Sequence, residues 1–188
     1  METPAPWIQT FSGRAFPLLN PTRDDVSIKD IAHSLSMQCR FAGHTKRFYT
    51  VAEHCVLVSR AVPSDLALVM LMHDAAEAYV QDITRPLKEI FTGYRDVENR
   101  IWRAIAYRYN LPGVLPEAVK LADMRMLATE AKALMGPPPQ TWNLPFPSYA
   151  MEEIGLVFPE QLGVPQVLAH AMFMDRFSEL ITHPGLSA

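Results

Sequence analysis

The sequence predicts an all-α protein: a single-domain helical bundle that follows a short irregular or hairpin segment. Three observations lead to this prediction. Apolar residues recur at helical spacing from about residue 27 onward, capping residues stand where these patterns begin, and strand-like alternation is almost absent. A length of 188 residues suits one domain, taken here as residues 1–188 with a core of about 27–181.

The N-terminal segment and the first helix have separate signals. Apolar residues at 8–11 and 15–19 flank Ser12-Gly13-Arg14, a pattern that is typical of a small hairpin. A helix is then expected from Ser27 to about residue 40, because its apolar residues follow helical spacing.

Five further helices are expected. Thr50 and Glu53 fit a T-x-x-E capping box at the start of the second helix. Pro116 and Pro165 are placed to open the last two helices, whereas Pro86 is interpreted as a break. The expected ranges are about 50–61, 65–79, 94–109, 116–135 and 165–181.

Composition excludes several classes of protein. The net charge of -3 argues against a broad nucleic-acid surface, which is usually basic. The longest purely apolar run, Leu66–Met72, is far shorter than a membrane span requires. The two cysteines form no C-x-x-C pair, and the N-terminus lacks the pattern of a signal peptide. We therefore expect a cytoplasmic protein that binds neither nucleic acid nor a membrane.

One end of an apolar helix carries a cluster of ionisable residues. His73 and Asp74 follow an apolar run, Glu77 lies four residues after His73 on the same predicted face, and Asp82 comes just past the helix end. Burying several carboxylates together is costly, because each loses its hydration and repels the others. A divalent cation would remove both costs.

Two more polar residues are predicted to point into the core, as the His73-Asp74 cluster is. His54 has Val51, Leu57 and Val58 as its helical neighbours, and Asp123 is likewise surrounded by apolar residues on its own helix. Two imidazoles and two carboxylates suit one Mn, Fe, Co, Ni or Zn ion and leave positions open for water and substrate. The predicted ligands are His54, His73, Asp74 and Asp123.

Each of these residues has a plainer interpretation when it is taken alone. A single helical histidine such as His54 is more often a core or surface residue, and Asp123 fits a cap or a pair with Arg125. A His-Asp dipeptide arises by chance in many chains. The combination is a stronger signal, because all of these residues fall on inward faces.

The order of these residues along the chain, His54, then His73-Asp74, then Asp123, resembles the H…HD…D signature of the HD-domain metal phosphohydrolases. Further stretches are similar to the bacterial 5'-deoxynucleotidases of that superfamily, and to their phage and prophage branch in particular, over about residues 7–180. These stretches include Ala52-Glu53-His54, Met72-His73-Asp74, Gln81-Asp82-Ile83, Arg85-Pro86-Leu87-Lys88, Lys120-Leu121-Ala122-Asp123 and Cys39-Arg40-Phe41.

The resemblance implies an HD-type fold and roles for individual residues. Glu77 would assist proton transfer or orient the attacking water, and Asp82 would lie near the sugar or that water. Arg40 would contact the phosphate, with Phe41 beside the sugar. The absence of histidine between His73 and Asp123 favours a single metal ion.

The implied function is the removal of the 5'-phosphate from deoxynucleoside monophosphates, by a homo-oligomer that is a dimer or larger. Three alternatives stay open: a deoxynucleoside triphosphate triphosphohydrolase, a nucleotide-binding regulator without activity, and an interaction protein with a structural metal. Additional candidates for contact with the phosphate are Lys46, Arg47 and Lys88, for which a solvated basic surface is the competing interpretation. His44, in the same basic loop as Lys46, is a candidate for the phosphate or the edge of the metal site.

The proline-rich stretch 136–148 is expected to be a loop that packs against the body of the protein. Its aromatic residues, Trp142 and Phe146, are candidates for a base pocket. Core packing is the favoured interpretation of both.

Overall fold

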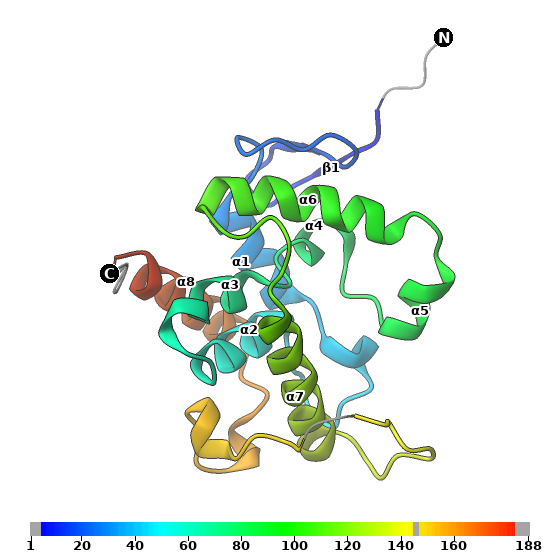
Figure 1. Cartoon of the computed structure of the whole chain (residues 1–188), viewed down its shortest axis with the longest axis vertical. Helices are drawn as coiled ribbons and strands as arrows, with labels where there is room; N and C mark the ends of the chain where they lie inside the picture. The colour runs from blue at the N-terminus through cyan, green and yellow to red at the C-terminus, as the bar shows by residue number, and fades with distance from the viewer. Residues whose placement is uncertain (1–4, 145–146, 183–188) are drawn as a thin grey trace.

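The computed structural model describes residues 5–144 and 147–182, which form eight α-helices and one two-stranded hairpin (Figure 1). The prediction of an all-α fold with an N-terminal hairpin is confirmed. The helices are α1 (Ile28–Met37), α2 (Val51–Arg60), α3 (Ser64–Met72), α4 (Glu77–Val80), α5 (Arg85–Ile90), α6 (Tyr94–Tyr109), α7 (Glu117–Leu134) and α8 (Gln166–Thr182). Among the described residues, no helix is both long enough and apolar enough to cross a bilayer.

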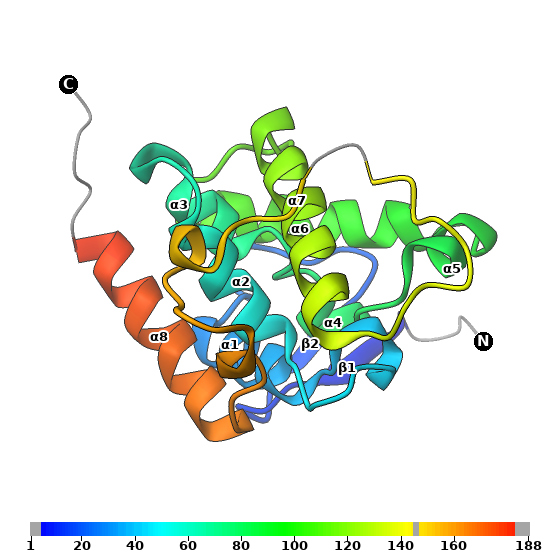
Figure 2. The ribbon, with the colours of Figure 1, turned by 90° about the horizontal axis from the view of Figure 1, so that it is seen from below.

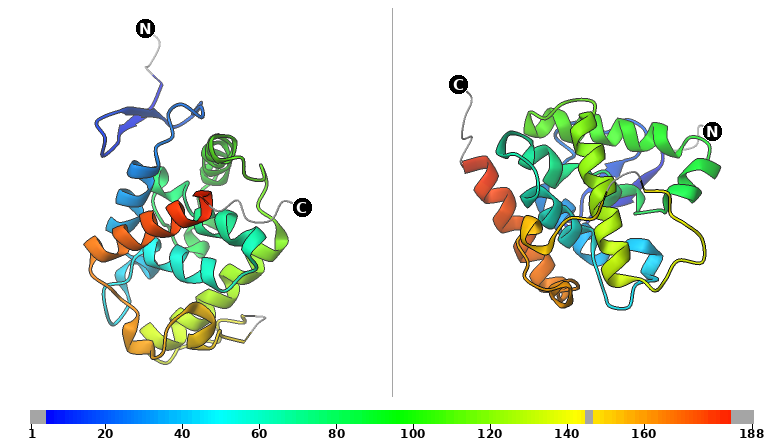
Figure 3. Two further views of the ribbon diagram at one scale, coloured as in Figure 1. Left: turned by 90° about the vertical axis from the view of Figure 1, so that its left-hand side faces the viewer. Right: turned by 60° about the horizontal axis from the view of Figure 1, so that its bottom comes forward.

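The hairpin pairs β1 (Trp7–Gln9) antiparallel with β2 (Ala15–Pro17) and lies at one end of the molecule (Figure 3). Asp30 of α1 holds the turn between the strands, because its carboxylate accepts hydrogen bonds from the Ser12 amide at 2.7 Å and the Ser12 hydroxyl at 2.8 Å. Phe16 is fully buried and stacks on Tyr79. The hairpin is thus anchored to the helical core.

Helix α2 is the central helix, and its residues from Val51 to Ser59 are all buried. The Thr50 hydroxyl accepts a hydrogen bond from the Glu53 amide at 3.1 Å, as the capping box predicts. The second hydrogen bond of a capping box, from the Thr50 amide to the Glu53 carboxylate, is absent. The Glu53 carboxylate instead accepts from the amides of Gly163 and Val164, at 2.8 and 3.0 Å, and so ties α2 to the segment before α8.

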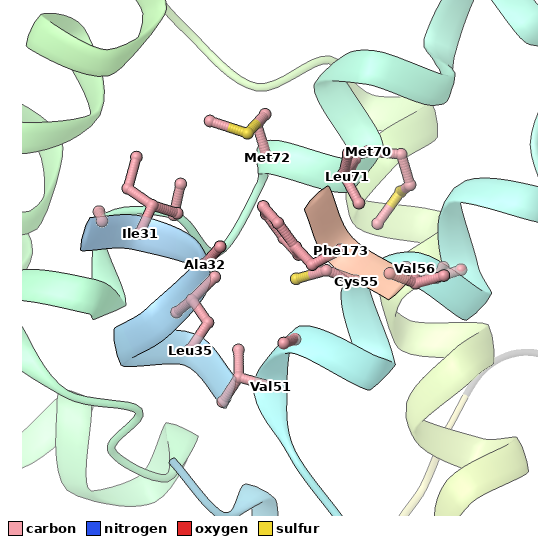
Figure 4. Packing of buried hydrophobic residues seen from close by; sticks show 14 of the residues in the cluster. Ile31, Ala32, Leu35, Val51, Cys55, Val56, Met70, Leu71, Met72 and Phe173 are labelled. Carbon is pink, nitrogen blue, oxygen red and sulfur yellow. The ribbon is translucent and has the colours of Figure 1, made fainter. Parts of the chain in front are cut away.

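Helix α8 packs against α1, α2 and α3 along one side of the molecule (Figure 2). Its Phe173 is fully buried and points among side chains of the other helices, beside Cys55 and Val56 (Figure 4). Through this contact, α8 covers the part of the core that α1 and α2 form.

The structure divides the expected helix 65–79 into two helices, so the prediction of one continuous helix was wrong. Helix α3 ends at Met72, and residues 73–76 form turns before α4 begins at Glu77. The backbone bonds here span three residues, as in the 2.9 Å bond from the Glu77 amide to the Asp74 carbonyl. His73 also bonds its own ring Nδ1 to the Met70 carbonyl at 2.7 Å, a carbonyl at the C-terminal end of α3.

Three proline positions also differ from expectation. Pro86 lies in the first turn of α5 rather than at a break, since a helix needs no N–H bond there. Pro116 and Pro165 precede α7 and α8 instead of opening them. The sequence therefore placed these helix starts to within one residue, but it missed α5.

Candidate metal centre

Two imidazoles from different elements meet in the interior. His54 lies on the buried helix α2, and His73 directly follows the last residue of α3. Their Nε2 atoms are 3.3 Å apart. Asp123 of α7 completes the group, with its Oδ1 at 3.4 Å from Nε2 of His54 and 3.7 Å from Nε2 of His73.

Asp74 reaches the same point from the turn after α3. Its Oδ1 is 3.3 Å from Nε2 of His73, and its Oδ2 is 3.6 Å from Nε2 of His54. The structure therefore brings together all four ligands that the sequence predicts. The imidazoles are buried, while the Asp74 and Asp123 side chains are 18% and 26% exposed, so the carboxylates form the open side of the cluster.

The outer ring nitrogens show that this donor set fits a cation. Nδ1 of His54 lies 2.5 Å from Oε1 of Glu130, and Nδ1 of His73 lies 2.7 Å from the Met70 carbonyl. Both partners are acceptors, so each Nδ1 carries a hydrogen, and in neutral rings the two Nε2 lone pairs would face each other. Lone pairs at 3.3 Å repel unless a proton or a metal ion lies between them.

Glu130 is a member of this site that the sequence analysis missed. It is fully buried on α7, and besides His54 it accepts from the Tyr49 hydroxyl at 2.8 Å and from Nε of Arg40 at 3.1 Å. A carboxylate behind a metal-binding histidine fixes its tautomer and orientation. The available signal was the pattern used for Asp123, because Met126 and Leu134 flank Glu130 at four residues on either side.

Charge coupling within the cluster is visible in the pKa values. Burial opposes ionisation of His73, but Asp74 and Asp123 together raise its pKa well above the ordinary value. Burial also opposes ionisation of Asp123, yet hydrogen bonds from both imidazoles hold its pKa well below the ordinary value. A metal ion must displace the proton that this arrangement retains, so metal affinity falls as the pH falls.

Cys55 lies near enough to His73 and Asp74 to form a second possible donor group. Burial raises the pKa of its thiol to about 11, so the thiol stays protonated at neutral pH. Because the thiolate is the form that binds metals, the group with His54 and Asp123 is the better candidate.

Glu77 lies beside the centre in a separate ion-pair cluster. Lys88 places its Nζ 2.8 Å from Oε1 of Glu77 and 2.7 Å from Oε1 of Glu98. The other oxygen of Glu77 is buried and has no hydrogen-bond partner within the described part of the chain. Burial and the charges of Asp74 and Asp82 raise the pKa of Glu77 well above the ordinary value, although Lys88 lowers it.

A cavity of about 1020 Å³ opens onto the centre. Arg40 lines it beside the centre, held by Glu130, with one terminal nitrogen 3.4 Å from Oδ2 of Asp74. Among the residues that sequence reasoning singled out, those lining the cavity are Arg40, Phe41, His44, Asp74, Glu77, Asp82, Lys88, Asp123 and Trp142.

Two of the phosphate candidates lie elsewhere. Lys46 lines a neighbouring cavity, and its amide bonds the Leu134 carbonyl. Arg47 donates to the carbonyls of Pro159 and Glu160 at 2.9 and 2.7 Å, and so holds the segment before α8. Phe146 is outside the described residues.

The fold and this site define a helical protein with a buried His/Asp cluster that is suited to a metal ion. The chain is 44% identical over 174 residues to the uncharacterized protein YfdR of Escherichia coli K12, covering 93% of this chain and 95% of that protein. It is also 38% identical over 144 residues to the uncharacterized protein RCAP_rcc00048 of Rhodobacter capsulatus, covering 69% and 74% of the two chains. The chain belongs to the family of YfdR. No family model matches it.

Proposed function

We propose that this chain is an HD-type, metal-dependent phosphohydrolase that removes the 5'-phosphate of deoxynucleoside monophosphates. One observation carries the proposal: two Nε2 atoms face each other at 3.3 Å beside two partly exposed carboxylates, at the inner end of a cavity that also holds Arg40. The resemblance of the H…HD…D pattern to the phosphohydrolases supplies the reaction class and the nucleotide.

Four side chains would hold the ion: His54, His73, Asp74 and Asp123. Bound there, a divalent cation would supply a water-derived nucleophile at neutral pH and withdraw charge from a phosphoryl oxygen. Arg40 has five N–H donors, and its bonds to Glu130 and Asp74 use two of them. We assign the others to the phosphate, for which a guanidinium fork is well suited.

Glu77 is the proposed proton-transfer group. Its unpartnered oxygen can hydrogen-bond a water molecule, and burial together with Asp74 and Asp82 raises its pKa, which favours the protonated form. Lys88 holds the other oxygen of Glu77 and so fixes the carboxylate plane. We place Asp82, which lines the same cavity, near the sugar or the attacking water.

A second candidate function is the triphosphohydrolase reaction, and one observation favours it. Arg85, Arg95 and Lys120 also line the cavity and add cationic groups beyond Arg40 and Lys88. Such groups suit a substrate with more than one phosphate. Both reactions break the bond between the 5'-oxygen and the adjacent phosphorus, so the deoxynucleoside is the leaving group in each. They differ in whether orthophosphate or tripolyphosphate is released and not in the proposed centre.

Product analysis tests the proposal. The metal-free protein is incubated with Mn, Co or Zn and with deoxynucleoside mono- and triphosphates, alongside an Asp74→Ala control. Orthophosphate from monophosphates, lost in the control, is the expected result. Tripolyphosphate from a triphosphate would move the assignment to the second candidate, and no product with any metal would refute the enzymatic function. Homo-oligomerisation stays a separate prediction, which sedimentation velocity checks.

A further inference from the structure

The cavity has walls of two kinds. Some lining residues are charged, and one of them, Arg40, lies at the metal centre with a terminal nitrogen 3.4 Å from Oδ2 of Asp74. Other lining residues are apolar, among them Phe41, Leu127, Met135, Trp142 and Leu144. A site for a small ligand is commonly built this way, with apolar walls and a few polar groups that fix orientation.

Trp142 is the aromatic residue of this wall that comes from the proline-rich loop. It remains 40% exposed, whereas the tryptophan of α6, Trp102, is only 5% exposed and belongs to the core. Trp142 borders both the main cavity and the neighbouring one beneath the loop. Core packing, the interpretation that the sequence favoured, therefore does not describe its surroundings.

Phe41 links Trp142 to the phosphate end of the cavity. The Arg40 guanidinium lies 5.7 Å from the Phe41 ring centroid, and that centroid lies 6.0 Å from the Trp142 ring. The two rings are inclined at 57°, so they do not stack on each other. Phe41 also adopts a left-handed backbone conformation, with φ 55° and ψ 31°, which is strained for an aromatic residue and typical of functional sites.

We propose that Trp142 forms, together with Phe41, the subsite that binds the nucleobase, by stacking on its flat face. This inference rests on the proposed function, because it takes the phosphate to lie at Arg40. A nucleotide has the matching order of groups: a phosphate, a sugar and a flat aromatic base. Stacking accepts every base, because each has a π-face, and favours the larger purines over pyrimidines.

Binding measurements that need no turnover test this subsite. The metal-loaded protein is titrated calorimetrically with deoxyadenosine, which lacks a phosphate, and separately with inorganic phosphate. Trp142→Ala should weaken deoxyadenosine binding about tenfold or more, leave phosphate binding unchanged, and raise the KM for deoxynucleotides but not for 2-deoxyribose 5-phosphate. Trp142→Phe should retain most of the affinity, because it keeps an aromatic face.

Trp7→Ala is the matched control, since Trp7 is 58% exposed in the hairpin and does not line the cavity. Equal deoxyadenosine affinity in Trp142→Ala and the unmodified protein would overturn the subsite. Phosphate binding without any deoxyadenosine binding would overturn the subsite alone. A protein that binds neither probe would refute the proposed function as well.

Discussion

At the scale of single residues, Glu130 determines the geometry of the centre without reaching the cavity. It is fully buried and accepts hydrogen bonds from Tyr49, Arg40 and His54. Arg40 and His54 hold its pKa below the ordinary value despite the opposing effect of burial, so it is ionised. One carboxylate therefore positions both a predicted metal ligand and the predicted phosphate-binding arginine.

Glu130→Gln tests this positioning role. The amide keeps the shape of the side chain but removes the charge that orients His54, so metal affinity should fall about 10- to 100-fold. Competition with a chromophoric chelator measures the change. Glu153→Gln is the control, because Glu153 pairs with Arg125 at the surface. A folded Glu130→Gln protein with unchanged metal affinity would contradict the assignment.

The charge of Lys88 affects the pKa of Glu77, and this coupling predicts that replacing Lys88 shifts the pH dependence of activity. The cation lowers the pKa of Glu77, so Lys88→Met should raise that pKa. The limb of the kcat/KM profile that Glu77 governs should then move to higher pH, whether Glu77 acts as acid or base. Lys29→Met, at an exposed position of α1, is the control. An unmoved limb in the Lys88 variant would show that Glu77 is not the titrating group.

The sequence could predict which His and Asp residues cluster, but not their hydrogen-bond partners. His54 and Asp123 stand out because a polar residue interrupts an apolar face. Arg47 and Lys46 resemble phosphate-binding residues in composition, but only the folded loop shows that Arg47 donates to carbonyls of a distant segment. Such long-range contacts leave no local pattern in a single sequence.

At the scale of elements, the break between α3 and α4 is the main departure from the predicted helices. Apolar spacing is continuous through residues 65–79, so periodicity alone predicts one helix. The structure tightens residues 73–76 into turns instead, and His73 and Asp74 thereby both face His54. By contrast, α6 matched the predicted 94–109, because its apolar residues keep helical spacing and the helix is not interrupted.

The segment before α8 depends on one glycine. Gly163 has φ +92°, and a Cβ there would lie 2.7 Å from the Phe48 carbonyl oxygen. Gly163→Ala should lower the free energy of unfolding by about 1–3 kcal/mol, because it combines backbone strain with a steric clash. Urea denaturation measures this. Gly136→Ala is the control, because a Cβ added at that position would meet no atom within 4 Å. Equal urea midpoints for the two variants would show that Gly163→Ala introduces no strain.

At the scale of the whole molecule, the proposed centre joins parts of the chain that are far apart in sequence. Its ligands come from α2, the turn after α3, and α7. An ion that binds these three segments in the native state but not in the unfolded chain stabilises the fold. A bound ion would also offset the cost of keeping this polar cluster inside an otherwise apolar core.

Metal removal should therefore lower thermal stability. At about 100 times the dissociation constant, a bound ion adds about 2.7 kcal/mol to the free energy of unfolding. Differential scanning fluorimetry should show a higher Tm with Mn or Co than with a chelator. Asp123→Asn should lose this difference. A Tm that does not respond to any divalent ion would argue against a centre that bridges the helices.

The proposed metal centre is tested most directly by the number of divalent ions bound per chain, measured by equilibrium dialysis and elemental analysis. We predict one ion for the unmodified protein, none for His73→Ala or Asp123→Ala, and one for the control Cys39→Ala, which lies outside the cluster. An unmodified protein that binds no ion, or ligand variants that bind as well as the control, would contradict the account.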